Sequence, residues 1–578
     1  MNLHIIEKNR ALNLFIKLLF IISTPFMIRI FSLSVNILYM IFEMLISFLI
    51  VMILVFKYDF IEKAFKNISC KQMIVAIIFS IYILHLNFII ILKHIKDVMF
   101  IVGKFDKFLP NFFLNILNDK IIYILLPFYL LAIFPCFVFI SFILNNFSKS
   151  IKQFFNVIDR KELKYITTLT MFFSILIVIV FIFTNVLNTK ICDIIYTLDT
   201  NFMEEVFIRF GMNENDIRHP LFGLFALPIS LPAKVISNIF PFIPNLYLIL
   251  LLSFQLIILN IAIIFLCRML GIEGSLKFLI ASIFAITYPS ILFIFFLEKY
   301  VLTFSYLIFF LYVYIKKNND DRYKKLFYIG ITGTLITSGI LFPLISSNNI
   351  KSNFKGFILD ILNTALIFFV IIILIGQLKV FVDGFNRVNL LLSNFGGGKI
   401  SFLDKIYQYT NFISSCFIKP TTTIYSGDNL NPFFQIFVPN YQMVKATSIN
   451  IFGVLLLIIS AIGFVINRKE IIVKISGFWI LLSFIILIII GYGIQENGLV
   501  LYSLYFSWAF FVLIYKAIDK IFSKLIEYSI HFQKIKIIFL VSIFIVLLVI
   551  NTIGLIDLIK FGIEYYPTDF TRNLGLFK

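Results

Sequence analysis

The sequence predicts an all-α protein, a polytopic bundle of transmembrane helices, and three observations carry that prediction. Hydrophobic residues make up 61% of the 578 residues, well above the share of ~45–50% in soluble domains. Charged residues make up only 14%, against ~25% in a typical globular chain. Apolar runs of about 20 residues, the length that a helix needs to cross a bilayer, recur along the whole chain. A soluble enzyme, a disordered chain and a disulfide-stapled secreted module are therefore excluded.

About 13 apolar runs are long enough to span the bilayer. Because every backbone polar group in lipid must be hydrogen-bonded within the protein, we expect these runs to be helices. In chain order the runs lie near residues 12–31, 34–56, 73–93, 121–147, 165–187, 246–267, 276–296, 299–315, 357–377, 448–466, 476–493, 499–515 and 537–558.

The distribution of basic residues predicts the orientation of the bundle. The net charge is +19, with 49 Lys and Arg against 30 Asp and Glu. If the N-terminus is cytoplasmic, the loops rich in Lys and Arg all fall inside, as the positive-inside rule expects. These loops are residues 57–71, 149–164, 316–325, 468–474 and 516–536. The expected partner of this basic chain is therefore the lipid bilayer of the cell membrane, and no nucleic acid is expected.

Residues 326–345 are apolar enough to span the bilayer, but a full span there would move the later basic loops outside. We therefore expect a re-entrant helical hairpin broken near Ser338 and Gly339. Small residues at that point let the backbone turn, provided that the break is buried in protein.

Two long loops fall on the outer side, residues 188–245 and 379–446. The first half of the first loop, 188–220, is acidic. Its second half, 221–244, is apolar but contains four prolines, which favours helices lying on the membrane surface over a span. Loops of this length are usually functional or disordered, and the many aromatic residues of the second loop favour an ordered loop that faces the membrane.

Asp199 is the best candidate for a catalytic residue, in the segment YTLDTNFMEEV of the first outside loop. A carboxylate about one turn beyond a span is held at the interface, where it can act as a general base towards a hydroxyl or amine. It can instead help to bind a metal ion, and a solvated loop acid is the further alternative. The neighbouring Glu204 and Glu205 are expected to be solvated.

Two further elements are candidates for substrate binding. Arg218 and His219 stand directly before the apolar half of the first loop, where the Arg fork is suited to a phosphate. Contact of this pair with lipid headgroups is the alternative. Glu496 and Asn497 lie in a very short outside turn, and a carboxylate at membrane depth is predicted to face a polar cavity. The alternative there is a simple exposed turn.

The order of these parts resembles the GT-C superfamily of integral membrane glycosyltransferases. A span is followed by an outside loop with an early acid, a His-Pro-Leu element, closely spaced spans, a hairpin and a large second outside loop. The bacterial branch that contains lipid A aminoarabinose transferases and protein O-mannosyltransferases is the most similar. The resemblance covers residues 165–560. This chain has Asp199-Thr200-Asn201 where the family usually has an acidic pair.

The resemblance implies a hexosyl- or pentosyltransferase of the cell envelope with a GT-C-like core over residues 161–560. Its donor is a sugar on polyprenyl phosphate, and its acceptor is a glycan, lipid or protein on the outer face. Asp199 takes the role of catalytic base or metal-linked acid, which leaves a divalent metal ion open as a cofactor. Arg218 or a Lys of the second loop offsets the phosphate charge; those lysines are Lys399, Lys405 and Lys419.

The remaining parts of the chain carry fewer expectations. Residues 1–160 are a four-span region without a readable role, and residues 561–578 are a short outside tail. A transporter or flippase of a lipid-linked glycan is the main alternative function. It predicts a continuous polar path across the membrane, and few ionisable residues fall in the middle of a span. An assembly factor without a chemical site is a third class.

Overall fold

The structure is a computed structural model, and it confirms a predominantly helical, multi-pass membrane type of fold. It describes residues 10–32, 37–66, 68–105, 126–145, 154–188, 194–196, 198, 200–209, 217–316, 321–346, 353–386, 388–389, 400–426, 435–439, 449–493 and 497–573. Among these residues, 11 helices are long and apolar enough to cross a membrane, or up to 12 if one bent pair counts as a single span.

The chain divides into two compact units, each described here by itself. The first unit combines Met1–Asp159 with Val206–Phe225 and Leu335–Asn386, and the second combines Arg160–Glu205, Ala226–Thr334 and Arg387–Lys578. The division into a four-span region, a GT-C-like core and an outside tail stays a prediction.

Long apolar helices dominate the first unit. Helix α3 packs on α2, α4 and α15, and α2 also contacts α5. The helices are α2 (Arg10–Phe31), α3 (Ile37–Tyr58), α4 (Phe60–Phe65), α5 (Cys70–Phe105), Leu126–Asn145, the 3-10 helix η2 (Ile336–Leu344), α15 (Phe354–Leu374) and α16 (Leu378–Asn386).

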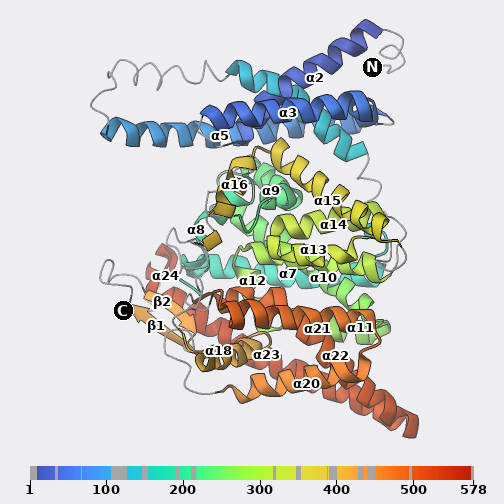
Figure 1. Ribbon diagram of the computed structural model, residues 1–578. Helices are drawn as coiled ribbons and strands as arrows, with labels where there is room; N and C mark the ends of the chain where they lie inside the picture. Colours follow the sequence, from blue (N-terminus) through green and yellow to red (C-terminus); the bar gives the residue numbers. More distant parts are fainter. Residues whose placement is uncertain are drawn as a thin grey trace. The chain divides into compact units, whose positions relative to one another are not determined.

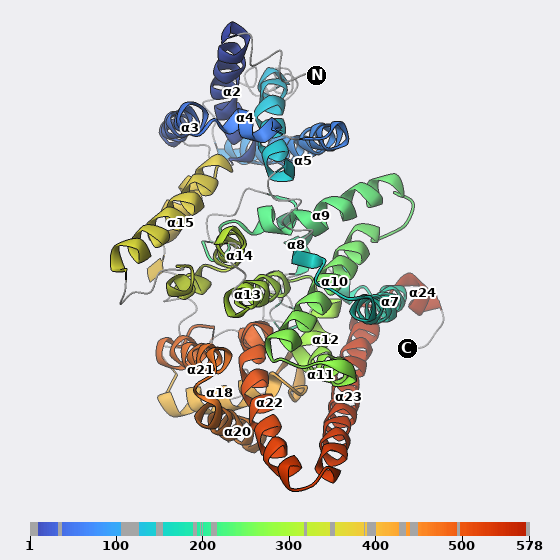
Figure 2. The same cartoon turned by 90° about the vertical axis from the view of Figure 1, so that its right-hand side faces the viewer.

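The second unit is a helix bundle whose main members run in roughly one direction (Figure 1) and are seen close to end-on in Figure 2. Its centre is α22, which packs on α13, α20, α21 and α23. The helices up to the second long loop are α7 (Arg160–Phe183), η1 (Val186–Asn188), α8 (Thr200–Val206), α9 (Phe222–Ile239), α10 (Leu246–Met269), α11 (Gly274–Ala285), α12 (Tyr288–Phe295), α13 (Lys299–Ile315) and α14 (Asp321–Thr334).

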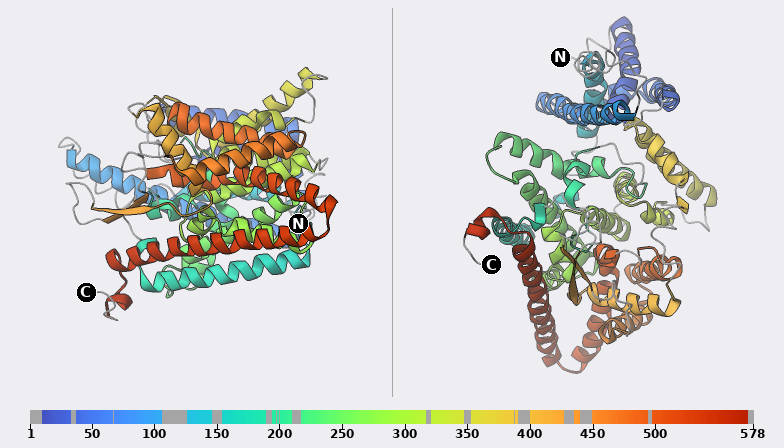
Figure 3. Two further views of the ribbon diagram at one scale, coloured as in Figure 1. Left: turned by 90° about the horizontal axis from the view of Figure 1, so that it is seen from below. Right: turned by 90° about the vertical axis from the view of Figure 1, so that its left-hand side faces the viewer.

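The second long loop and the last spans complete this unit. The elements are α18 (Phe402–Ser415), β1 (Thr422–Ser426), β2 (Gln435–Pro439), α20 (Ile451–Asn467), α21 (Ile471–Phe484), the π-helix η3 (Ile485–Ile490), η4 (Asn497–Tyr502), α22 (Ser503–Tyr528), α23 (His531–Tyr565) and α24 (Asp569–Asn573). Figure 3 shows α23 as one long helix. Its C-terminal end meets the end of α7, where Thr184 pairs with Pro567.

Most predicted spans correspond to helices, with three differences. The predicted span 276–296 is a bent pair, α11 and α12, at an angle of 68°. Helices α13 and α20 have 17 residues each and are shorter than every helix counted as a candidate span. The apolar half of the first long loop, predicted as helices on the membrane surface, is the single helix α9, which contains Pro228 and Pro232 and is long and apolar enough to be one of the candidate spans. Figures 1 and 2 show it running across the direction of α10 and α13. The exact number of spans stays a prediction.

The break after α14 comes earlier than the sequence predicts. Helix α14 ends at Thr334, Leu335 is extended with φ −154° and ψ 110°, and Ser338 and Gly339 lie inside η2. The backbone N–H of Ile336 donates to the carbonyl of Arg218 at 2.8 Å, so it cannot continue the helical hydrogen bonding of α14. Whether this segment re-enters the membrane stays a prediction.

A β-hairpin in the second long loop departs from an all-α fold. Strands β1 and β2 pair antiparallel, with Thr422 opposite Pro439 and Ser426 opposite Gln435. Strand β1 contains Thr422, Thr423 and Ile424, whose branched side chains favour the extended backbone. The aromatic content predicted an ordered loop but not the strands.

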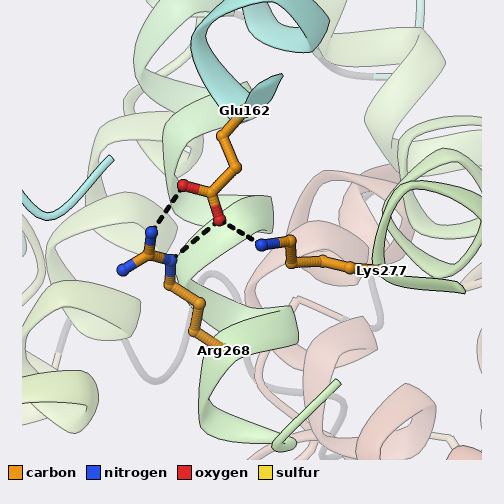
Figure 4. Close-up of polar contacts among 3 residues, drawn as sticks. All are labelled: Glu162, Arg268 and Lys277. Carbon is orange, nitrogen blue, oxygen red and sulfur yellow. Dashed lines mark hydrogen bonds and ion pairs between the residues drawn. The ribbon is translucent and has the colours of Figure 1, made fainter. Parts of the chain in front are cut away.

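A buried ionic cluster joins the starts of α7 and α11 to the end of α10 (Figure 4). The Glu162 carboxylate has no exposed surface; it accepts hydrogen bonds from Nε and Nη2 of Arg268 at 2.9 and 2.5 Å and from Nζ of Lys277 at 2.6 Å. A buried carboxylate needs partners of this kind, because the loss of water otherwise costs several kcal/mol. The cluster therefore fixes three helix ends relative to one another.

Replacement of Glu162 by Leu should lower the free energy of unfolding by ~3–5 kcal/mol, because two cations then lose their carboxylate in a water-poor site. Chemical denaturation in detergent micelles measures this. The triple variant Glu162→Leu, Arg268→Met, Lys277→Met should recover most of the loss, since no charge is left unpaired. Lys164→Gln, at an exposed position of α7, is the control. Unchanged unfolding of Glu162→Leu would show that the cluster has no role in stability.

Candidate functional site

The structure describes the predicted site residues unequally. Asp199 and Glu496 lie outside the described residues. Asn497 begins η4, and its side chain also lies outside the described part. Arg218 and His219 are described together in the first unit. The convergence of these residues in one site therefore stays a prediction.

Arg218 and His219 lie in a tight turn before α9. His219 is 2% exposed, its carbonyl accepts the N–H of Phe222 at 3.2 Å, and its ring packs edge-on against that of Phe222 at 6.5 Å between centroids. Arg218 is half-buried, and its carbonyl is held by the N–H of Ile336. The turn is thus fixed by backbone hydrogen bonds on both sides of its polar pair.

The chain just before Asp199 is held by β2 and α12 of the second unit. The N–H of Tyr196 donates to the carbonyl of Phe437 at 3.0 Å, and the N–H of Phe437 donates to the carbonyl of Ile194 at 2.7 Å. The hydroxyls of Tyr196 and Tyr288 are 2.6 Å apart and buried. Tyr196 has φ 50°, in the left-handed region. This unusual backbone is therefore stabilised from two directions, and Asp199 follows three residues later.

Asn551 of α23 joins the bend between α11 and α12 to the second long loop. Its amide donates to the carbonyls of Ile286 and Phe417 at 2.7 and 2.8 Å, and its oxygen accepts the N–H of Lys419 at 2.9 Å. The Lys419 ammonium makes an ion pair with Asp557, one turn and a half further along α23. One buried side chain therefore satisfies three backbone groups, one at the break between α11 and α12 and two in the turn that follows α18.

The three lysines proposed to offset a phosphate charge have different surroundings. Lys399 lies outside the described residues, and Lys405 is 9% exposed on α18. The side chain of Lys419 is 27% exposed and that of its partner Asp557 is 37% exposed. Of the two described lysines, Lys419 therefore has both a backbone fixed by a hydrogen bond and a side chain that solvent or a ligand can reach.

Sequence reasoning missed a pair of charged residues between two apolar helices. Glu298 and Lys299 connect α12 to α13 and are 2% and 5% exposed. The next residue, Tyr300, packs edge-on against Tyr502 at the end of η4, with 5.5 Å between ring centroids. The signal was present in the sequence: two adjacent opposite charges stand where the predicted span 276–296 gives way to the predicted span 299–315. Buried charges at membrane depth are typical of functional sites.

Glu204, expected to be solvated, is half-buried on α8. Burial raises the pKa of its carboxyl group, and the nearby ammonium of Lys234 acts in the opposite direction. Lys234 lies 4.7 Å from the ring centre of Tyr247, whose hydroxyl donates to the carbonyl of Glu204 at 3.3 Å. Helix α8, which begins one residue after Asp199, is therefore held by contacts with α9 and α10. Glu205 is exposed, as expected.

Within the described residues, His, Cys, Asp and Glu side chains form no group of three or more that could hold a metal ion. Comparisons of the chain with protein-family models, with curated proteins and with solved structures found no match. The functional argument therefore rests on the residues themselves.

Replacement of Asn551 by Leu should release the turn around Lys419, because three backbone groups lose their partner at ~1–3 kcal/mol each. The readout is Cys416, which is fully buried. In a variant that keeps Cys416 as its single cysteine, Asn551→Leu should speed maleimide labelling.

Ser542→Ala, at an exposed position of the same helix, should leave the labelling rate of Cys416 unchanged. Equal labelling rates for Asn551→Leu and the parent protein would mean that Asn551 does not hold the second loop in place.

Proposed function

We propose that this protein is a membrane glycosyltransferase of the GT-C type. It transfers a sugar from a polyprenyl-phosphate donor to a glycan, lipid or protein acceptor on the outer face of the cell membrane. The observation that carries the proposal is the fixed position of the segment before Asp199. The two hydrogen bonds with Phe437 and the contact between Tyr196 and Tyr288 hold this segment on strand β2 and on the start of α12.

A group-transfer site needs an acid or base that is held at a defined place relative to the donor. Asp199 stands directly between that fixed segment and α8, which Tyr247 holds through the carbonyl of Glu204. Lys419 brings a cation to the same network through Asn551 and the contacts of Phe417. Chain segments that are held on either side of an acid in the sequence, together with a cation in the second long loop, suit the proposed phosphate leaving group and acceptor hydroxyl.

The proposed reaction is a single displacement. Asp199 removes the proton from the acceptor hydroxyl or amine, and the acceptor atom forms the new bond to the anomeric carbon of the sugar. The bond from that carbon to the phosphate oxygen breaks, and polyprenyl phosphate leaves with inversion at the sugar carbon. Arg218, with His219, and Lys419 offset the charge of the leaving phosphate. Glu496 and Asn497 are assigned to the acceptor or sugar side.

Asp199→Asn should lower sugar transfer by ~10²–10⁴-fold, because an amide cannot accept the acceptor's proton. The measurement uses membranes that contain the protein and a radiolabelled polyprenyl-phosphate sugar. Glu205→Gln is the matched control, since Glu205 is an exposed acid on the adjoining α8, and it should transfer sugar like the wild type. Wild-type transfer by Asp199→Asn would refute the assignment of the catalytic base.

A further inference from the structure

Glu43 is a buried carboxylate in the first unit, in a part of the chain with no role in the proposed reaction. It lies on α3 within the candidate span Ile41–Tyr58 and is 2% exposed. Its Oε2 accepts a hydrogen bond from the hydroxyl of Ser32 at 3.1 Å. The backbone N–H groups of Leu378 and Lys379, together with the guanidinium of Arg29, stabilise the charged form of this carboxylate electrostatically. Burial of a carboxylate in an apolar helix costs free energy, so the groups that it contacts indicate its role.

Those two N–H groups are the first two of α16. A carboxylate there compensates both the unsatisfied amides and the positive end of the helix dipole. The turn before α16 is equally close to the first helices. A Cβ on Gly376, which has φ 67°, would lie 2.8 Å from Cβ of Ser32 and 2.9 Å from the carbonyl of Ile28. The start of α16 is therefore fixed on α2 and α3.

The far end of α16 touches the turn that carries Arg218 and His219. A Cβ on Gly384 would lie 2.5 Å from Cβ of Ile217, a separation that leaves no room for any side chain. Ile217 is 6% exposed and directly precedes Arg218. A displacement of α16 must therefore move Ile217 and the polar pair that follows it, because close-packed contacts transmit displacement.

We propose that Glu43 is a positioning residue: by capping α16 it sets the place of Arg218 and His219, and this gives the N-terminal helices a part in binding the donor. The binding role of Arg218 and His219 rests on the proposed function. The mechanical link from Glu43 through α16 to Ile217 does not, because it follows from contacts within the first unit alone.

Amide hydrogen exchange of the full-length protein in nanodiscs tests the link. Glu43→Ala should raise exchange in residues 376–386 and in residues 217–222, and leave residues 41–58 and 70–89 as protected as before. Glu43→Asp, which keeps an acceptor for the amides, should restore part of the protection. Ser47→Ala is the control, because Ser47 is a buried residue one turn along α3 whose hydroxyl bonds to Met44 of its own helix.

Gly384→Leu attacks the same link from its other end and should raise exchange in residues 217–222 with Glu43 intact. Unchanged exchange of residues 217–222 in both Glu43→Ala and Gly384→Leu would overturn the proposal. An equal rise across α3 and α5 in Glu43→Ala would also overturn it, since that pattern indicates general loosening of the unit.

A sugar-transfer assay adds a second readout. Glu43→Ala should raise the KM for the polyprenyl-phosphate sugar by about 2- to 30-fold, with a smaller change in kcat, because the residue acts on binding groups through packing. If the wild type itself transfers no sugar, the proposed function fails while the exchange result still decides the link. If the wild type is active and Glu43→Ala has an unchanged KM, the link to donor binding is wrong.

Discussion

The second unit depends on one constraint: backbone groups within an apolar layer must find hydrogen bonds inside the protein. A straight helix meets this constraint by itself, whereas a bend or an extended segment does not. Side-chain amides supply the missing bonds at the bent pair α11 and α12. Asn551 serves the carbonyl of Ile286 at the bend, and Gln255 of α10 donates to the carbonyls of Phe293 and Phe296 where α12 ends, at 2.9 and 3.3 Å.

These bonds permit the features that separate this unit from a simple bundle of straight helices. At the bend, the hydroxyl of Tyr288 contacts the hydroxyl of Tyr196. After the end of α12, the chain passes through the buried residues Glu298 and Lys299. The ionic cluster of Glu162 joins the starts of α7 and α11 to the end of α10. Charge thus fixes three helix ends of this unit, and the amides of Asn551 and Gln255 fix the bent pair α11 and α12.

The sequence predicted what depends on local pattern. Apolar length located the helices, and an acid after a span drew attention to residues 188–220, part of which the structure holds firmly through Tyr196 and Glu204. It did not predict contacts between distant segments. Asn551 reads as one polar residue in an apolar run, and its role appears only when residues 286, 417 and 419 meet it. The hydrogen bond from the N–H of Ile336 to the carbonyl of Arg218 likewise joins residues more than 100 positions apart.

The proposed glycosyltransferase cleaves a lipid-linked sugar, whereas a transporter or flippase carries it across the membrane intact. The most direct measurement follows a polyprenyl-phosphate sugar, with separate labels on sugar and lipid, in proteoliposomes that contain the purified protein and an acceptor-bearing membrane extract. The account predicts that the two labels separate and that free polyprenyl phosphate accumulates in proportion to the protein. Movement of the intact doubly labelled lipid between leaflets, with no separation of the labels, would contradict it.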